Sequence, residues 1–214
     1  LAALQCLLAA HAGLRVVFLV DSLAQLALIE AWFSAHPGSV PFEVMLEIGV
    51  PGGRTGCRSH DEAAALARAL HASAALKFVG IECYEGLGAT EASAQLADEQ
   101  HLFEANEVLV SAGGSAIFDL VAGRLKPALG RPVRGLLRSG CYVTHDHGFY
   151  QRLVGVAKQR CACSDGLLAA MEVWATVQSR PEPGLAILAV GKRDISYDMA
   201  LPVPIAPAAR GAMS

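Results

Sequence analysis

Short apolar runs alternate with helical segments along most of this chain, and this alternation constrains its fold more than any other feature. Each run is short, apolar and rich in branched residues, as expected of a strand that is buried on both faces. Each is followed by a segment with helical periodicity or a capping signal. Such repeats in series predict a parallel sheet with its helices outside. The predicted strands are residues 15–20, 42–48, 77–82, 107–111 and 133–137.

Two of the predicted helices begin with a capping box, in which a Ser and a Glu or Gln three residues later satisfy each other's backbone N–H groups. The pairs are Ser22 with Gln25 and Ser59 with Glu62. Further helices are predicted over residues 1–11, 91–105, 116–122 and 146–156, the last with Asp146 as a candidate cap.

A doubly wound sheet and a (β/α)8 barrel both satisfy this alternation, and periodicity alone does not separate them. Each predicted strand leads into polar or Gly-rich sequence, which is where a barrel places its site. The pattern changes after about residue 165, where residues 171–178 and 185–190 read as strands joined by a turn cluster, which favours antiparallel pairing. We therefore expect a barrel domain over residues 1–165 and the start of a β-rich domain over residues 166–214.

Composition and charge exclude several classes of protein. Hydrophobic residues make up 53% of the chain and charged residues 17%, which is typical of a folded domain rather than a disordered one. The formal net charge is −3 and no run of Lys or Arg occurs, so no nucleic-acid partner is expected. Charged residues interrupt every apolar run before it reaches the length of a membrane span, so no membrane partner is expected either.

The cysteines and the ends of the chain bear on its setting. Six cysteines in 214 residues favour a reduced, cytoplasmic protein over a disulfide framework. The chain opens at Leu1, inside a predicted helix, and closes in an aperiodic Pro-rich stretch. We therefore expect a fragment of a longer protein, and a short natural protein with a frayed tail is the alternative.

Two Gly-rich segments at predicted strand ends carry candidate binding residues. Glycines flank Arg54 within GVPGGRTG, so the backbone can approach a ligand beside a permanent charge. Gly113, Gly114 and Ser115 lie between a strand and a helix, where backbone N–H groups and a hydroxyl can hold a small monophosphate. Taken singly, each segment is also typical of an ordinary loop or turn.

Two further segments, ECYEG and GCY, place Tyr84 and Tyr142 at strand ends, where a tyrosine can donate to a phosphate or stack on a ring. Most tyrosines in such positions only pack.

Together and in this order, these segments resemble parts of the alanine-racemase-type enzymes that use pyridoxal phosphate (PLP). The segments are LEIGVPGGRTG, ECYEG, VSAGGS and GCYVTHD, and the nearest likeness is to the D-serine deaminase / D-threonine aldolase branch. The later stretch WATVQSRPEPGLAILAVGKRDISYDMALP resembles the start of that branch's C-terminal β-domain. The resemblance spans residues 15 to about 202, and the order and spacing of the motifs make it specific.

The resemblance implies an alanine racemase-like (β/α)8 TIM-type barrel, partial in this chain, with PLP at its mouth. Three barrel strands and the Schiff-base lysine are then expected upstream of residue 1. The family's divalent-metal ligands, for Zn or Mn, are expected in the distal β-domain outside this chain. None of the four lysines lies in a matching context, so no catalytic lysine is assigned to Lys77, Lys126, Lys158 or Lys192.

The resemblance also implies cofactor contacts. Arg54 should face the cofactor ring or the substrate carboxylate, and facing the pyridine nitrogen it would keep that nitrogen unprotonated. Cys141 stands where relatives often have Ser, and a thiol is the poorer donor. The Gly-Gly-Ser turn should hold the phosphate, and the two tyrosines should line the pocket. The implied cofactor-binding residues are Arg54, Tyr84, Gly113, Gly114, Ser115, Gly140, Cys141 and Tyr142.

The function implied by the resemblance is that of a PLP-dependent lyase acting on a β-hydroxy D-amino acid. Deamination of D-serine to pyruvate and ammonia is the first expectation, because the GGRTG form is closer to that subgroup. Retro-aldol cleavage of D-threonine is the alternative. A non-catalytic PLP-binding barrel protein and an α/β protein with another phosphate ligand are alternatives of other classes. A homodimer is implied because relatives often build the site across two chains.

Two other clusters could suggest metal binding. Cys161 and Cys163 lack a second pair of thiols, so they are poor evidence for a zinc site. His145, Asp146 and His147 are consecutive, and neighbours on a strand point to opposite faces, so a loop or helix-start role is favoured.

Overall fold

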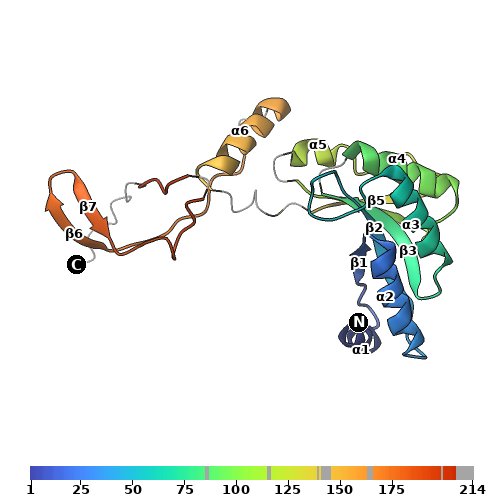
Figure 1. The fold of residues 1–214 in the computed structure, drawn as a ribbon. Helices are drawn as coiled ribbons and strands as arrows, with labels where there is room; N and C mark the ends of the chain where they lie inside the picture. Colours follow the sequence, from blue (N-terminus) through green and yellow to red (C-terminus); the bar gives the residue numbers. More distant parts are fainter. Residues whose placement is uncertain are drawn as a thin grey trace. The chain divides into compact units, whose positions relative to one another are not determined.

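The computed structural model describes residues 1–84, 87–114, 117–138, 140, 146–162, 166–198 and 200–205 (Figure 1). They belong to two compact units, Leu1–Gly140 and Cys141–Ser214, and each is considered by itself. Among the helices of these residues, none has the length and apolar character that a bilayer crossing requires.

The described residues of the first unit form a five-stranded parallel sheet whose strands follow one another in sequence order. A doubly wound sheet reverses its strand order at a switch point, and no reversal occurs between these strands. Sequence order is that of a (β/α) barrel, here an open arc in which the first and last strands do not pair. The predicted barrel-type α/β fold is therefore confirmed. The strands are β1 (Val17–Val20), β2 (Phe42–Ile48), β3 (Leu76–Cys83), β4 (Val108–Ala112) and β5 (Val133–Leu137).

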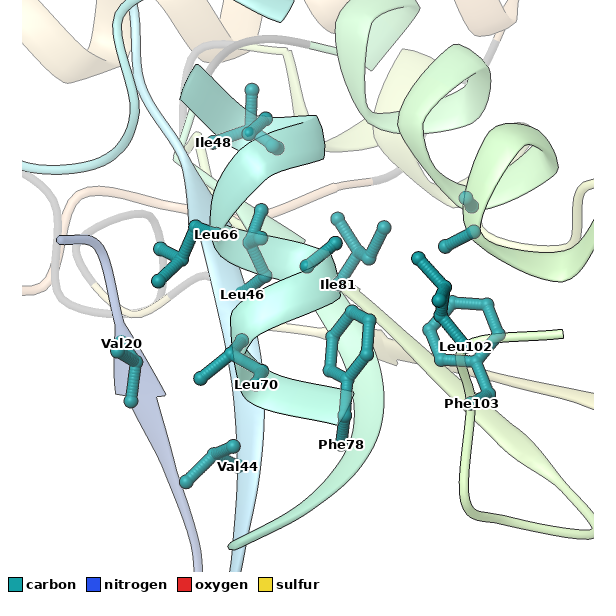
Figure 2. Close-up of a cluster of buried hydrophobic side chains, with 14 of the residues drawn as sticks. Val20, Val44, Leu46, Ile48, Leu66, Leu70, Phe78, Ile81, Leu102 and Phe103 are labelled. Atoms are coloured by element: carbon teal, nitrogen blue, oxygen red, sulfur yellow. The ribbon is translucent and has the colours of Figure 1, made fainter. Parts of the chain in front are cut away.

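The helices of this unit are α1 (Ala2–Ala10), α2 (Leu23–Ser34), α3 (His60–Ala72), α4 (Leu87–Glu99) and α5 (Phe118–Ala122). Right-handed crossovers between strands added in one direction put every connecting helix on the same face. The main core accordingly joins buried residues of α2 to α5 to one face of the sheet. In Figure 2, Leu66 and Leu70 of α3 lie beside Leu46 of β2 within this core.

A bulge in β3 decides which face each of its later residues occupies. Val44 of β2 pairs with Phe78, but the next residue, Met45, pairs with Gly80, so Val79 is skipped. Side chains alternate with period two, and the extra residue reverses the faces of everything after it. Gly80 also permits a close approach, because a Cβ there would lie 2.1 Å from the carbonyl oxygen of Leu109.

The predicted capping boxes are confirmed in full at one helix and in part at the other. Ser59 Oγ accepts from Glu62 N at 3.2 Å, and the Glu62 carboxylate accepts from Ser59 N at 3.3 Å. Ser22 Oγ accepts from Gln25 N at 3.3 Å, but the Gln25 side chain accepts from Asp21 N instead of Ser22 N.

The predicted helix over residues 91–105 was wrong at both ends, because α4 spans Leu87–Glu99. The helix ends in a Schellman motif: Leu102 N donates to Ala97 O at 2.9 Å, and His101 N donates to Asp98 O at 2.9 Å. His101 takes the left-handed position with φ of 55°, where a Gly would have signalled the end. The chain then turns inward to bury Leu102 and Phe103.

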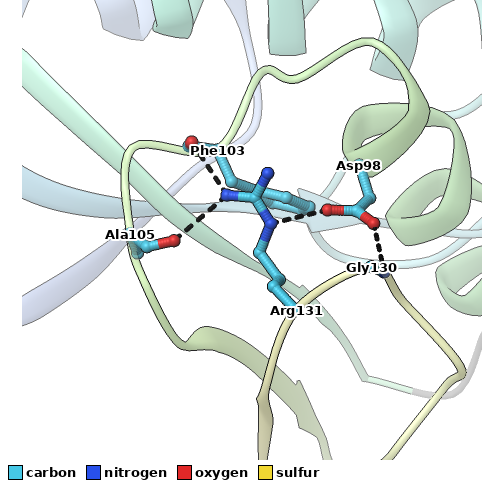
Figure 3. A network of polar contacts seen from close by, with 5 residues as sticks. All are labelled: Asp98, Phe103, Ala105, Gly130 and Arg131. Atoms are coloured by element: carbon cyan, nitrogen blue, oxygen red, sulfur yellow. Dashed lines mark hydrogen bonds and ion pairs between the residues drawn. The ribbon is translucent and has the colours of Figure 1, made fainter.

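Asp98 and Arg131 brace the end of α4 against the start of β5 (Figure 3). Arg131 Nε donates to Asp98 Oδ1 at 2.7 Å, and Gly130 N donates to Asp98 Oδ2 at 2.7 Å. Arg131 Nη1 also donates to the carbonyl oxygens of Phe103 at 3.3 Å and Ala105 at 3.1 Å. Both carboxylate oxygens of Asp98 are therefore satisfied.

The second unit contains α6 (Phe149–Cys161) and an antiparallel hairpin of β6 (Val177–Glu182) and β7 (Leu185–Leu188). Antiparallel pairing is as predicted, but the first strand was misplaced: β6 begins at Val177 and runs through most of the predicted turn cluster. The reversal falls next to Gly184, whose φ of +84° only Gly adopts readily.

The predicted cap of α6 was also wrong. Its N-cap is Gly148, and Asp146 Oδ1 accepts from Gly148 N at 2.7 Å, before the helix begins. The domain boundary near residue 165 stays a prediction.

Arg131→Ala should lower the free energy of unfolding by about 2 kcal/mol, because it removes a partly buried ion pair and two carbonyl contacts at once. Arg134→Ala is the matched control, since the Arg134–Glu107 pair is mostly exposed and should contribute less than about 1 kcal/mol. Urea unfolding of both variants measures the difference. Equal losses would contradict the bracing role of Arg131.

Candidate functional site

The carboxyl ends of β2, β3 and β4 carry a row of polar side chains on the sheet face away from the helices. Met45 and Leu109 belong to a small apolar cluster that contains no helical residue, which identifies this second face. Glu47 and Ser111 follow them by two residues and so point the same way. Glu82 pairs in register with both Glu47 and Ser111. In a barrel, this face lines the interior and these ends form its mouth.

Glu82, at the centre of this strand-end row, is fully buried. Its Oε1 forms an ion pair with Arg138 Nη2, and Arg138 follows directly after β5. Among the described residues, Glu82 Oε2 and Ser111 Oγ are buried without a hydrogen-bond partner. Burial raises the pKa of Glu82 and outweighs the opposing effect of Arg138. Buried polar atoms are nearly always paired, so two neighbouring orphans indicate a place for a further polar group.

The loop after β2 is closed at its neck by glycines. Gly49 N donates to Cys57 O at 2.9 Å, and Gly56 N donates to Asp21 Oδ2 at 3.2 Å. A Cβ on Gly56 would lie 2.3 Å from Gly49 N, and a Cβ on Gly49 would lie 2.1 Å from Thr55 O. These two glycines therefore serve the closure of the loop itself, a role that the sequence interpretation did not foresee.

The Arg58 side chain holds the backbone of this loop from within. The sequence analysis did not single out this residue. Its guanidinium donates to the carbonyl oxygens of Val50 at 2.9 Å, Gly53 at 2.7 Å and Thr55 at 2.7 Å. The predicted site residue Arg54 is exposed and forms no hydrogen bond or ion pair with any described residue. Arg58 thus shapes the loop, and the Arg54 side chain is left available to a ligand.

Thr55 links the loop to the strand-end row, because its hydroxyl donates to Glu47 Oε1. The neighbouring Cys57 is an inert thiol. Burial, together with Asp21, Glu62 and Glu47, raises its pKa to about 11, so it stays protonated.

The structure places Tyr84 beside the Gly113–Gly114 turn. A Cβ at Gly113 would lie 3.1 Å from Tyr84 Cδ2 and 3.3 Å from Arg138 O. Gly114 has φ of +115°, and a Cβ there would lie 3.1 Å from Ile117 Cγ1. The turn therefore packs under a half-exposed aromatic ring and beside the backbone of Arg138.

The remaining predicted positions are only partly described. Gly140 is exposed, and a Cβ there would meet open space. Within the described part of the chain, His, Cys, Asp and Glu side chains do not gather in threes as a metal site would require. Cys161 is exposed. Ser115, Cys141, Tyr142, His145 and Cys163 lie outside the described residues.

Sequence reasoning gave no role to four members of the site: Glu47, Glu82, Ser111 and Arg138. Of these, Glu82 and Ser111 lie in the segments ECYEG and VSAGGS that it singled out. The signal of all four was a charged or polar residue at or just after the end of an otherwise apolar strand, as in FEVMLEI and KFVGIEC. A strand buried on both faces has no room for an unpaired carboxylate. The bulge in β3 hid which face Glu82 occupies.

Glu82→Gln should change how stability depends on pH. The raised pKa means that the folded state binds the Glu82 proton more tightly than the unfolded state does. This contribution is fully present below the unfolded pKa of about 4.3 and is lost as pH rises through the folded pKa. Wild type should therefore lose stability relative to Glu82→Gln across that window in urea unfolding. A pH-independent difference would argue against a raised pKa.

Two family models match the sequence. The alanine racemase N-terminal domain matches residues 3–122, more than half of the chain and most of the sheet. The model described as "Putative serine dehydratase domain" matches residues 170–213, which include the hairpin. No curated protein matches.

Among solved structures, the crystal structure of D-threonine aldolase from Filomicrobium marinum is similar, with 25% sequence identity and a TM-score of 0.65. The match covers 96% of this chain and 56% of that protein, so the chain spans little more than half of this relative's length. Strand order and the match over more than half of the sequence agree. The chain belongs to the alanine racemase N-terminal domain family, in its D-serine dehydratase / D-threonine aldolase-like group of fold-type III PLP enzymes.

Proposed function

We propose that this chain forms part of a PLP-dependent lyase that acts on a β-hydroxy D-amino acid and deaminates D-serine to pyruvate and ammonia. The observation that carries the proposal is the strand-end row. There, two buried polar atoms without partners lie at the barrel mouth, and one of them belongs to a carboxylate paired with Arg138. Membership of the family supports PLP as the group that the site receives.

The residues present fit such a cofactor. At the Gly113–Gly114 turn, a side chain on Gly113 would crowd Tyr84, and glycine leaves room for a phosphate beside the backbone. Gly113 N already donates to Cys83 O at 3.0 Å, so the backbone donor offered to a phosphate would be Gly114 N. Tyr84, with 54% of its surface exposed, offers a ring edge or face to a flat aromatic group. When bound, PLP would supply the electron sink that the reaction needs.

We assign different roles to the two arginines. Arg138 is anchored at a strand end by its ion pair and by its N–H, which donates to Ala112 O at 2.8 Å. An anchored cation suits a cofactor ring, and beside a ring nitrogen its permanent charge would keep that nitrogen unprotonated. Arg54 lies on an exposed loop and is free to meet the carboxylate of an arriving substrate.

The other site residues keep their predicted roles within the proposal. Ser115 is still expected to hold the phosphate, and Gly140, Cys141 and Tyr142 to contact the cofactor, but Ser115, Cys141 and Tyr142 lie outside the described residues. The Schiff-base lysine and a divalent metal are proposed to come from residues outside this chain. A homodimer and a cytoplasmic location stay predictions.

Retro-aldol cleavage of D-threonine is the second candidate, because the similar solved structure is a D-threonine aldolase. The match of residues 170–213 to a serine dehydratase domain favours deamination. The same match argues against a non-catalytic PLP-binding barrel.

The purified full-length protein should show an absorption band at roughly 410–420 nm, where a protein-bound PLP absorbs. Adding D-serine should shift the band and yield pyruvate and ammonia. Glycine and acetaldehyde from D-threonine would instead establish the aldolase. A band without either product would leave a cofactor-binding protein, and no band after PLP addition would refute the proposal.

Gly114→Val should weaken PLP binding by about tenfold or more, because a branched side chain at φ of +115° forces the phosphate turn open. Gly38→Val is the matched control. Gly38 also has positive φ, +89°, but a Cβ there meets nothing, and it lies on the loop before β2, at the opposite end of the strands. Titration with PLP compares the affinities. Equal affinity of both variants would argue against the phosphate assignment.

A further inference from the structure

Burying the carboxylate of Glu82 costs free energy of folding, so stability does not explain why a carboxylate stands at this position. Apart from Lys77 near its start, β3 is buried along its length, and Glu82 itself is fully buried. Replacing a buried ion pair by apolar side chains of similar volume is often neutral or stabilising. Here the cost is greater still, because one carboxylate oxygen lacks a partner among the described residues.

The Arg138 guanidinium is held through one of its three nitrogens. Its Nη2 engages Glu82, whereas its other guanidinium N–H groups have no partner within the described part of the chain. Arg138 keeps 46% of its side-chain surface exposed. Because the guanidinium carries five donors in a rigid plane, holding one nitrogen orients the rest.

Charges around Glu82 leave Arg138 as its counterion. Glu47, on β2, is the carboxylate in register with Glu82 and repels it, while its own Oε1 accepts from Thr55. On β4 the neighbour is the neutral Ser111, whose hydroxyl is also without a partner among the described residues. Glu82 therefore lies in a buried acidic row, and its only described ion-pair partner is the half-exposed Arg138.

We propose that Glu82 is a positioning residue: its buried carboxylate holds the Arg138 guanidinium at the barrel mouth, with its remaining donors facing the bound cofactor. This rests on the proposed function, because the site it serves is the PLP site. In this role Glu82 acts through Arg138, by the ion pair between Oε1 and Nη2. Its role is distinct from that of Asp98, which also holds an arginine but has both oxygens satisfied.

The experiment replaces Glu82 by Met in the full-length protein loaded with PLP. Met has a similar volume and is apolar, so it removes the carboxylate without leaving a cavity, and the half-exposed Arg138 guanidinium loses its ion-pair partner. A purely structural Glu82 predicts at most a change in stability, with an unchanged site. The positioning role predicts an altered site in the folded variant. The absorption maximum of bound PLP and its dependence on pH should change, and kcat should fall about tenfold or more with a smaller change in KM.

Two variants calibrate this result. Glu82→Gln keeps an oxygen that can accept from Arg138, so it should restore part of the wild-type spectrum and kcat. Glu107→Met makes the same substitution in the exposed ion pair with Arg134, at the other end of β5, and should leave spectrum and kcat unchanged. A wild-type spectrum, pH dependence and kcat in folded Glu82→Met would overturn the proposal. If that variant does not fold, wild-type behaviour of Glu82→Gln at all pH values would overturn it equally.

A readout without cofactor separates this inference from the proposed function. Crystal structures of the cofactor-free wild type and Glu82→Met should show the Arg138 guanidinium displaced in the variant. An unmoved guanidinium would refute the positioning role even if the protein uses PLP. A wild type that binds no PLP would refute the proposed function. The position of the Arg138 guanidinium in the two cofactor-free structures would still test whether Glu82 holds it in place.

Discussion

The register between β2, β3 and β4 is the constraint on which the rest of the site depends. Without the extra residue at Val79, Glu82 would pair with Ile48 and point into the helix-covered core. With it, Glu82 falls between Glu47 and Ser111 on the opposite face. Gly80 makes this geometry possible, because any side chain there would collide with the backbone of β4. Gly80, by permitting this register, thus decides on which face of the sheet the buried carboxylate of Glu82 lies.

The polar groups that brace helices and strands are hydrogen-bonded more completely than those in the strand-end row. Among the bracing groups, Asp98 is bonded through both oxygens, and the capping box of α3 is reciprocal. In the strand-end row, Glu82 and Ser111 keep buried atoms without partners among the described residues. A third such atom among the described residues, Ser73 Oγ, lies alone at the end of α3. Unsatisfied groups cost stability wherever they occur, so the neighbouring pair on Glu82 and Ser111 fits a place prepared for another polar molecule.

In the loop after β2, the backbone is held in place while the Arg54 side chain has no partner among the described residues. Its neck is closed by Gly49 and Gly56, and its interior is held by three carbonyl contacts from Arg58. With backbone and neck fixed, Arg54 is presented on an ordered loop without being tied to it. The two arginines of the loop therefore have different roles. Arg58 holds the loop backbone in shape, and the Arg54 side chain is available to a ligand.

The sequence by itself determined the five β-α units and most of their boundaries, because burial on both faces and capping chemistry are local signals. It also located Tyr84 and the Gly113–Gly114 turn at strand ends, which the structure then brought into contact. The end of α4 was not predictable, since His101 stands where a Gly would have marked it. Strand order, the bulge that turns Glu82 to the inner face and its pairing with Arg138, 56 residues away, are long-range. Only the tertiary structure decided these, because register and ion pairing between distant strands depend on packing that no local pattern records.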